Sequence, residues 1–448
     1  MIEALFIAHL TVLGFLYRLL DEKVTRIIAI FYAIYMGAFT VLKPALLYYF
    51  GSYFPYSTNK PGPVAASLVG SLIFLVIQYV GIKLFADLPP PKFAVRLFDF
   101  DEATPRGVTF AFLVLMVISF VGCTIKFGDA GYLFKYVDTF AASMSLANGS
   151  YYLNSVAEIL VYGFLMFASY TYWKMPAKQS FGYLILALVL TFFWTKLANR
   201  TNVLVAILAW ASCAITPEQQ RRINVFALAA IGYVMLVLLY VVNYIRLGTI
   251  GSINFGSAIF GAIYGAAVDM SPVDNAVMLY SDLTSHDLMY FAYLAGAITP
   301  LVMIPSAIFP FKLRPDKDSA LTDLFFPHGA DQTFYHEGST LTFTIPGSGY
   351  ADAYYFGVVV ASALYVALFC WYLWIYRKGT RSSKFIAAFC MMVHIAGYRL
   401  SIESMFVSFY LFLSLIGFTR FLALLPSGAE ERQPPDDNAL PIPSGGPS

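Results

Sequence analysis

Four cationic residues of this chain stand at the ends of long apolar runs, where charged side chains are costly. They are Lys196 and Arg200 in the stretch WTKLANRTN, Arg246 in NYIRLG and Arg399 in GYRLSIE. The position of any one of these residues is explained if its side chain reaches the lipid headgroups. The arginine fork binds two phosphate oxygens at once and keeps its charge. Four such groups on one side of a membrane therefore predict a lipid phosphate or diphosphate ligand.

A long polar segment, residues 246–352, holds groups suited to acid–base chemistry. Three of the five histidines of the chain fall within it. Histidine and carboxylates are the side chains that most often move protons in catalysis. Asp331, His336 and Glu337 are therefore the candidate catalytic residues, with His336 beside Glu337 as the first choice for a base.

Three further ionisable residues lie within apolar runs. His394 is expected to make a hydrogen-bonded contact between helices. Lys43 and Glu158 either pair structurally or line a cavity, and the sequence does not choose between these alternatives.

The composition fixes the environment of all these groups. The chain has 448 residues, of which 59% are hydrophobic and 12% are charged, whereas soluble domains have about 25% charged residues. This composition predicts a polytopic membrane protein. The net charge of +2, from 28 basic and 26 acidic residues, gives no basic surface for nucleic acid. Without a HExxH motif, a Cys/His cluster or a P-loop, we expect no metal, no cofactor and no nucleotide hydrolysis.

Apolar runs of about 20 residues predict the elements that position these groups, since a helix of that length crosses the hydrocarbon layer. We expect an all-α fold of about eleven transmembrane helices, near 4–20, 27–49, 65–86, 107–124, 155–173, 181–197, 202–216, 223–245, 353–376, 385–398 and 404–425. The run 4–20 has no basic segment before it and no cleavage site after it, so it is expected to be a retained span.

Four regions follow from this pattern. Residues 1–245 form an N-terminal bundle, 246–352 an extracytoplasmic insertion, 353–426 the last helices, and 427–448 a disordered cytoplasmic tail. The orientation comes from basic residues in alternate loops, such as Arg221. The number of predicted crossings agrees with this orientation only if the insertion begins and ends on the far side of the membrane.

Within the insertion, the most apolar stretch is 288–311, and three prolines interrupt it. Such a stretch favours a re-entrant or interfacial segment over one straight span. A pair of true spans, near 255–270 and 288–311, is the alternative.

Three stretches of the second half of the chain resemble the Wzy-type polymerases of O-antigen and exopolysaccharide repeat units. They are ANRTNVLVAIL at 198–208, PLVMIPSAIFPFKLRPDK at 300–317 and GSTLTFTIPGSGYADAYYFG at 338–357. The order of elements, with a large outer loop late in the chain, is also similar. The family often has Glu two residues before the Tyr of the last stretch, whereas this chain has Asp352 before Tyr354.

The resemblance implies a metal-independent glycosyltransferase of the GT-C kind in the bacterial inner membrane, with its active site facing the periplasm. Its substrate would be oligosaccharide linked to undecaprenyl diphosphate, and its partners would be membrane lipids and a chain-length regulator of the Wzz kind. The leaving diphosphate would be held by Arg200, Arg246, Arg399 and Lys196.

The same resemblance implies residues for the acceptor, which is a second lipid-linked repeat unit. They are Lys312, Arg314, Asp352 and Tyr354. The alternative for the two basic residues is contact with lipid headgroups.

Two other functions fit the same sequence. An O-antigen ligase would use the same donor with lipid A core as the acceptor. A transporter or flippase for lipid-linked oligosaccharide would use the cations to line a translocation path, and broken helices in both halves of the chain would favour it.

Overall fold

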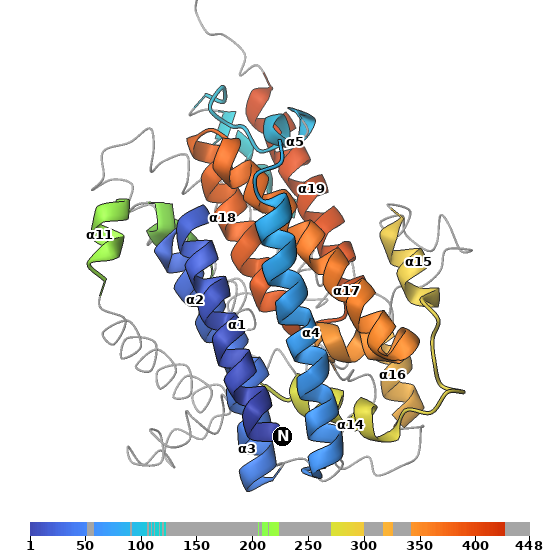
Figure 1. Cartoon of the computed structure of the whole chain (residues 1–448). Coiled ribbons are helices and arrows are strands. Elements are labelled where there is room, and N and C mark those ends of the chain that lie inside the picture. The colour runs from blue at the N-terminus through green and yellow to red at the C-terminus, as the bar shows by residue number, and fades with distance from the viewer. Residues whose placement is uncertain are drawn as a thin grey trace, which may run out of the picture.

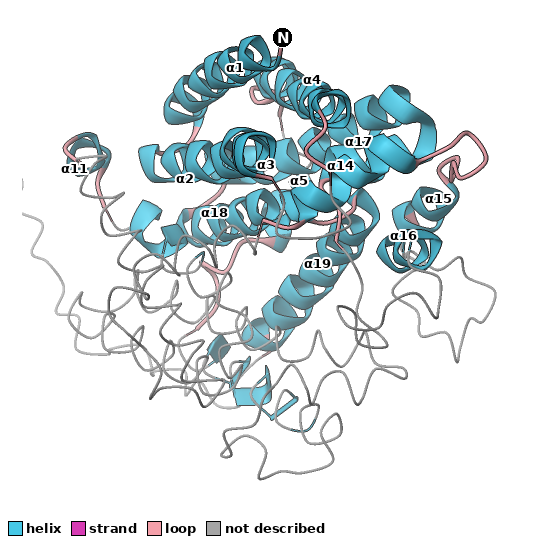
Figure 2. Cartoon of the chain, turned by 90° about the horizontal axis from the view of Figure 1, so that it is seen from below, coloured by secondary structure: helices cyan, strands magenta, loops and turns pink. Residues whose placement is uncertain are grey.

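The computed structural model describes residues 1–51, 58–89, most of 92–121, 205, most of 208–223, 270–299, 317–325 and 342–425. The regular elements of these residues are helices, and none of them forms a strand (Figures 1 and 2). This part of the chain therefore confirms the predicted all-helical class.

Five stretches are long and apolar enough to cross a membrane, as expected of a helical membrane protein. They are α1 (Ile2–Lys23), the continuous run Arg26–Phe50, α4 (Pro61–Phe85), α17 (Ile345–Lys378) and α19 (Ile402–Leu424). Each overlaps a predicted span. The shorter α18 (Arg381–Ala396) overlaps the span predicted at 385–398.

The remaining predicted spans are described in part or not at all. The described positions of 107–118 are helical, as are residue 205 and residues 208–213. The predicted spans 155–173, 181–197 and 223–245 lie outside the described residues. The count of eleven spans therefore stays a prediction.

The run Arg26–Phe50 is not a uniform helix. It consists of α2 (Arg26–Gly37), a π-helical turn (Ala38–Leu42) and α3 (Lys43–Phe50). Pro44 cannot donate a backbone hydrogen bond and its ring crowds the preceding turn, so the wider π turn accommodates it. The run ends at Gly51, whose positive φ of 83° suits glycine.

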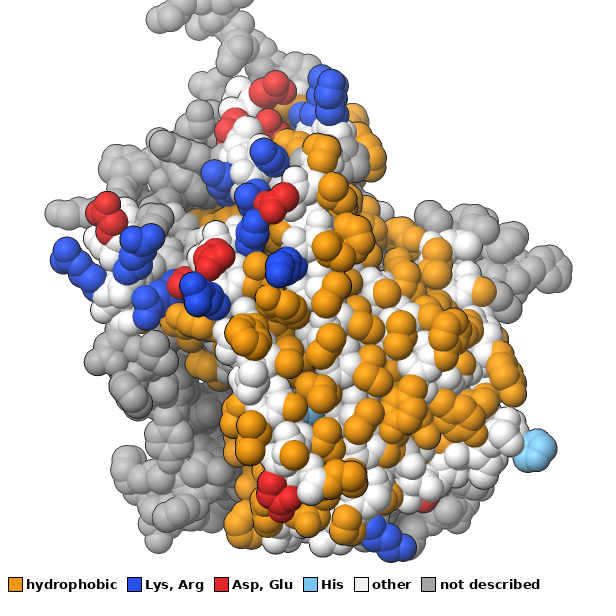
Figure 3. Space-filling view, in the orientation of Figure 1, with side chains coloured by type: hydrophobic (Ala, Val, Ile, Leu, Met, Phe, Trp, Pro, Cys, Tyr) orange, Lys and Arg blue, Asp and Glu red, His pale blue; other side chains and the backbone are white. Residues whose placement is uncertain are grey.

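Charged side chains gather at one end of the helix bundle. This basic end is defined by Lys23, Arg26 and Arg377, and Figure 3 shows hydrophobic side chains covering much of the helices beyond it. α1 and α4 run toward the basic end, whereas α2 runs away from it (Figure 1). We call the other end of the bundle the opposite end.

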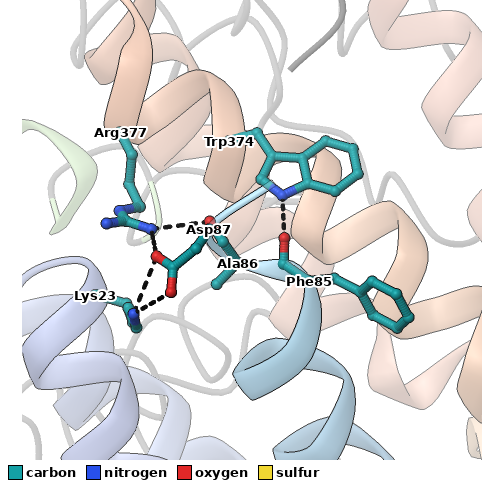
Figure 4. A network of polar contacts seen from close by, with 6 residues as sticks. All are labelled: Lys23, Phe85, Ala86, Asp87, Trp374 and Arg377. Atoms are coloured by element: carbon teal, nitrogen blue, oxygen red, sulfur yellow. Dashed lines mark hydrogen bonds and ion pairs between the residues drawn. The ribbon is translucent and has the colours of Figure 1, made fainter. Parts of the chain in front are cut away.

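Polar contacts among Lys23, Asp87 and Arg377, which we call the clamp, lie at the basic end (Figure 4). Lys23 of α1 and Arg377 of α17 both pair with Asp87, which follows α4, and the distance from Lys23 Nζ to Asp87 Oδ2 is 2.7 Å. Trp374 Nε1 donates to the Phe85 carbonyl over 2.5 Å. The hydrogen bonds from Lys23, and next those from Arg377, hold the pKa of the Asp87 carboxyl below its ordinary value.

The core lies where α17 packs along α4 and α18. Its aromatic side chains include the fully buried Tyr365, Phe74 and Tyr398, and the Phe74 ring lies edge to face with each of the two tyrosine rings. His394 is also buried there, with its ring nitrogen 3.0 Å from the Tyr365 carbonyl. The prediction of a hydrogen-bonded helix contact for His394 is therefore confirmed.

Five short helices complete the described part. They are α5 (Lys92–Leu97), α11 (Pro217–Arg221), α14 (Pro272–Asp282), α15 (Ala292–Ile298) and α16 (Lys317–Phe325). α14 and α16 lie toward the opposite end of the bundle (Figure 1). In the apolar stretch 288–311, the described helix is α15, which ends before Pro300.

Candidate functional site

The site is organised around a break in α17. This helix was predicted to begin at 353, but it begins at Ile345, where the Thr344 side chain accepts a hydrogen bond from Gly347 N. At Ala353 and Tyr354 the backbone leaves the helical region, and Tyr354 has a φ of 51°. The predicted start of the span therefore coincides with a break inside a longer helix.

The short first segment of α17, residues 345–352, packs tightly against the start of the second. A Cβ atom added to Gly357 would overlap the carbonyl oxygen of Gly349. Glycine at this position therefore permits a backbone approach that any side chain would prevent.

A left-handed turn between α14 and α15 satisfies the carbonyl groups that the break releases. Met289 N donates to Ala351 O over 3.0 Å, and Tyr290 N donates to Asp352 O over 3.1 Å. Phe291 N donates to the Asp352 carboxylate over 3.3 Å. Tyr290 and Phe291 both have positive φ, 46° and 61°. Such strained backbone is held only where the surrounding contacts require it.

Asp352 belongs to a buried cluster of charges, which we call the triad: Lys317, Asp352 and Glu403. Lys317 Nζ lies 2.6 Å from Asp352 Oδ2 and 3.5 Å from Glu403 Oε1. The side chains are 0%, 1% and 0% exposed, respectively. Burying charged groups is costly unless they pair, so the triad is a strong restraint on the elements that carry it.

Each member of the triad stands at the end of a helical segment. Lys317 is the first residue of α16, and Asp352 ends the first segment of α17. Glu403 lies in the first turn of α19, which Ser401 caps by accepting a hydrogen bond from Ser404 N. The N-terminal end of a helix favours an acidic side chain. The triad thus joins three helices that are far apart in the sequence.

A second buried ion pair lies between α3 and α14. Lys43, directly after the π-helical turn, places its Nζ 2.7 Å from Asp274 Oδ2, and the side chains are 7% and 0% exposed. Next to Asp274, the Asn275 side chain donates to the Thr342 carbonyl over 2.8 Å. Lys43 thus forms a buried ion pair with Asp274. Glu158 lies outside the described residues.

A cluster of tyrosines adjoins the break. The ring of Tyr350 lies 4.1 Å from that of Tyr280, 5.3 Å from that of Tyr354 and 5.4 Å from that of Tyr355. Tyr280 is buried, and a Cβ atom on Gly70 would overlap its hydroxyl group. Tyr355 is partly exposed. The cluster offers flat apolar faces edged with hydroxyl groups.

No protein-family model, no curated protein and no solved structure matches this chain.

Three of the predicted site residues lie in the described part of the chain. Asp352 and Tyr354 adjoin each other at the break, and Arg399 is half-buried in the single 3₁₀ turn Gly397–Arg399 before α19. The other eight lie outside the described residues: Lys196, Arg200, Arg246, Lys312, Arg314, Asp331, His336 and Glu337.

Sequence reasoning missed two members of the triad, Lys317 and Glu403. Lys317 is the last residue of the stretch 300–317, and Glu403 is the last residue of GYRLSIE. For Glu403 an available signal was that it is a lone charge at the edge of an apolar run, the same criterion that selected Arg399. Lys317 stands between Asp316 and Asp318, so it gave no such signal.

The arrangement brings ionisable side chains together away from water. It combines two carboxyl groups and one ammonium group, shielded from water, beside a backbone segment with unusual conformation. Among the described residues, no group of three or more His, Cys, Asp or Glu side chains has the spacing of a metal site. The described site offers ion pairs, hydrogen bonds and aromatic faces.

Proposed function

We propose that this chain is a membrane glycosyltransferase that polymerises oligosaccharide repeat units carried on undecaprenyl diphosphate. The observation that carries the proposal is the ion pair between Lys317 and Asp352. Lys317 closes the stretch 300–317 and Asp352 is the acid of the stretch 338–357, and both stretches resemble the Wzy-type polymerases. Two regions selected by resemblance are thus joined directly at one buried site.

The location of the site supports the proposal. The first segment of α17 lies toward the opposite end of the bundle, away from Lys23 and Arg377 (Figure 1). Since basic ends usually face the cytoplasm, the opposite end would face the periplasm of a bacterium, where lipid-linked repeat units are joined. The tyrosine cluster supplies faces on which sugar rings can stack.

The proposed reaction needs no external energy source. A hydroxyl oxygen of the acceptor sugar attacks the anomeric carbon of the donor glycan, and the bond from that carbon to the diphosphate breaks. The diphosphate leaves with the electron pair, and the hydroxyl proton passes to a base, for which His336 or Glu337 is the candidate. Arg200, Arg246, Arg399 and Lys196 would stabilise the charge that develops on the leaving group.

In this proposal the triad positions the substrate-binding elements. Asp352 holds the turn at Phe291 and receives the Lys317 ammonium, so it fixes the neighbouring Tyr354 at the edge of the tyrosine cluster. Tyr354 would contact the acceptor glycan. A chain-length regulator of the Wzz kind would act as a partner of the membrane helices.

The test is a polymerisation assay with the purified protein in lipid nanodiscs and its authentic undecaprenyl-diphosphate repeat unit, in EDTA. We expect a ladder of products on a gel. Arg200→Ala and Arg246→Ala should each lower the rate by about 10²-fold, as for the loss of one charge-stabilising group. Lys60→Ala, which removes an exposed cation, is the matched control and should keep the wild-type rate. Full activity of both arginine variants, extracted as folded monodisperse protein, would contradict the proposal.

A second candidate function is transport of the same lipid-linked oligosaccharide. The break in α17 beside buried charges favours it, because discontinuous helices carry the substrate sites of many transporters. In proteoliposomes, a transporter would move a labelled repeat unit across the bilayer without joining units. A ladder formed with no such movement would exclude this candidate. Products joined to lipid A core instead of to repeat units would identify a ligase.

A further inference from the structure

The triad carries an unequal number of charges. It holds one ammonium group, on Lys317, and two carboxyl groups, on Asp352 and Glu403, and their side chains are at most 1% exposed. If both carboxyl groups were ionised, one buried negative charge would have no cation of its own among the residues that the structure describes. Buried groups in this situation bind a proton instead of keeping the charge.

The distances from Lys317 distinguish the two carboxyl groups. Asp352 Oδ2 lies 2.6 Å from Lys317 Nζ in an ion pair without hydrogen-bond geometry, and Asp352 Oδ1 accepts from Phe291 N over 3.3 Å. The Lys317 charge is therefore compensated by Asp352.

Glu403 is bound much less tightly. Its Oε1 lies 3.5 Å from Lys317 Nζ, at the limit of a hydrogen bond. Its Oε2 is buried and has no hydrogen-bond partner among the described residues. The charged groups that face Glu403 in the described part of the chain are Lys317 and Asp352, and Arg399 makes no ion pair with it there. α15, which packs against α19, has no charged residue.

We propose that the triad is a proton-binding site, in which Glu403 carries one proton at neutral pH beside the ion pair of Lys317 and Asp352. Loss of that proton would leave two carboxylates competing for Lys317. Because Asp352 also holds the left-handed turn at Phe291, the competition would loosen the break in α17. Proton binding is thus coupled to the conformation of the segment that carries Tyr354.

This inference does not depend on the proposed polymerase function. A proton bound to a buried carboxyl group can be used in acid–base chemistry or in transport, and the test below reads the proton itself and no enzymatic activity. A failed polymerisation assay and a failed proton measurement therefore remain distinguishable.

The test is infrared spectroscopy of the full-length protein in nanodiscs at neutral pH. The C=O stretch of a protonated carboxyl group is separated from that of a carboxylate and shifts in heavy water. We expect the wild type to show this band and Glu403→Gln to lose the component assigned to Glu403. Asp352→Asn should lose it as well, because Lys317 would then pair with an ionised Glu403. Asp282→Asn, which changes an exposed acid, should leave the band unchanged.

Three outcomes would overturn the proposal. The wild type shows no protonated-carboxyl band, Glu403→Gln leaves the band at full intensity, or Asp352→Asn leaves it unchanged. The first measurement needs no variant, so an absent band overturns the proposal even if a substitution prevents folding. If Glu403→Gln does not fold, Glu403→Asp replaces it, and the band must then shift in frequency; an unshifted band also overturns the proposal.

Discussion

Lys317 is the residue on which the charge balance of the described site depends. Its ammonium group is fully buried and is the cation that both Asp352 and Glu403 contact. A buried ion pair adds little stability compared with apolar residues of the same size, but removing one partner leaves an uncompensated group in a water-free environment. Substitutions of the three members of the triad are therefore expected to differ in their effect on stability.

We predict that Lys317→Met lowers the free energy of unfolding by about 3–5 kcal/mol, the usual cost of breaking a buried ion pair from one side. Asp352→Asn should cost less, because Glu403 remains to pair with Lys317. The measurement is thermal unfolding of the detergent-extracted proteins. Lys60→Met, which alters an exposed lysine, is the control. A Lys317→Met protein as stable as the wild type would show that the triad does not restrain the fold.

At the scale of elements, the sequence predicted the spans better than their ends. The run 353–376 was recognised from its apolar residues, but the segment 345–352, which contains Pro346, was assigned to the preceding insertion. The same Pro346 is compatible with a helix start, since the first turn needs no backbone donor there. The break itself depends on contacts with Met289, Tyr290 and Phe291, which sequence periodicity does not contain.

The break in α17 depends on the absence of a side chain at Gly357. A methyl group at this position would overlap the backbone oxygen of Gly349, which has no flexible side chain to yield. Gly357→Ala should therefore lower the melting temperature and weaken any activity that needs the Tyr354 segment. Gly14→Ala is the matched control, because a Cβ atom there meets nothing within 4 Å, and alanine favours a helix by about 0.5–1 kcal/mol. Equal melting temperatures of the two variants would show that the backbones at Gly349 and Gly357 do not approach each other closely.

At the scale of the whole molecule, the triad illustrates what the sequence left open. Lys317, Asp352 and Glu403 come from three helices, and hydropathy gives no distance between helices. Asp352 was selected because it lies in a stretch that resembles a family, whereas Lys317 and Glu403 stood at the edges of quoted stretches with no feature that linked them to it. The charge criterion for apolar runs identifies candidates, and only packing shows which candidates meet.

The clamp at the basic end ties α1, α4 and α17 together and makes the stability of the whole bundle depend on pH. Because Lys23 and Arg377 lower the pKa of Asp87, the clamp stabilises the folded protein above the ordinary aspartate pKa of about 3.9. This stabilisation is lost as the pH falls through the lowered pKa of the folded state. Asp87→Asn should therefore melt below the wild type at neutral pH, and the difference should shrink in acid and in high salt. Thermal unfolding from neutral to acidic pH measures this, with Asp282→Asn as the control that keeps the wild-type profile. A difference that grows as the pH falls would mean that Asp87 is not held by its two cations.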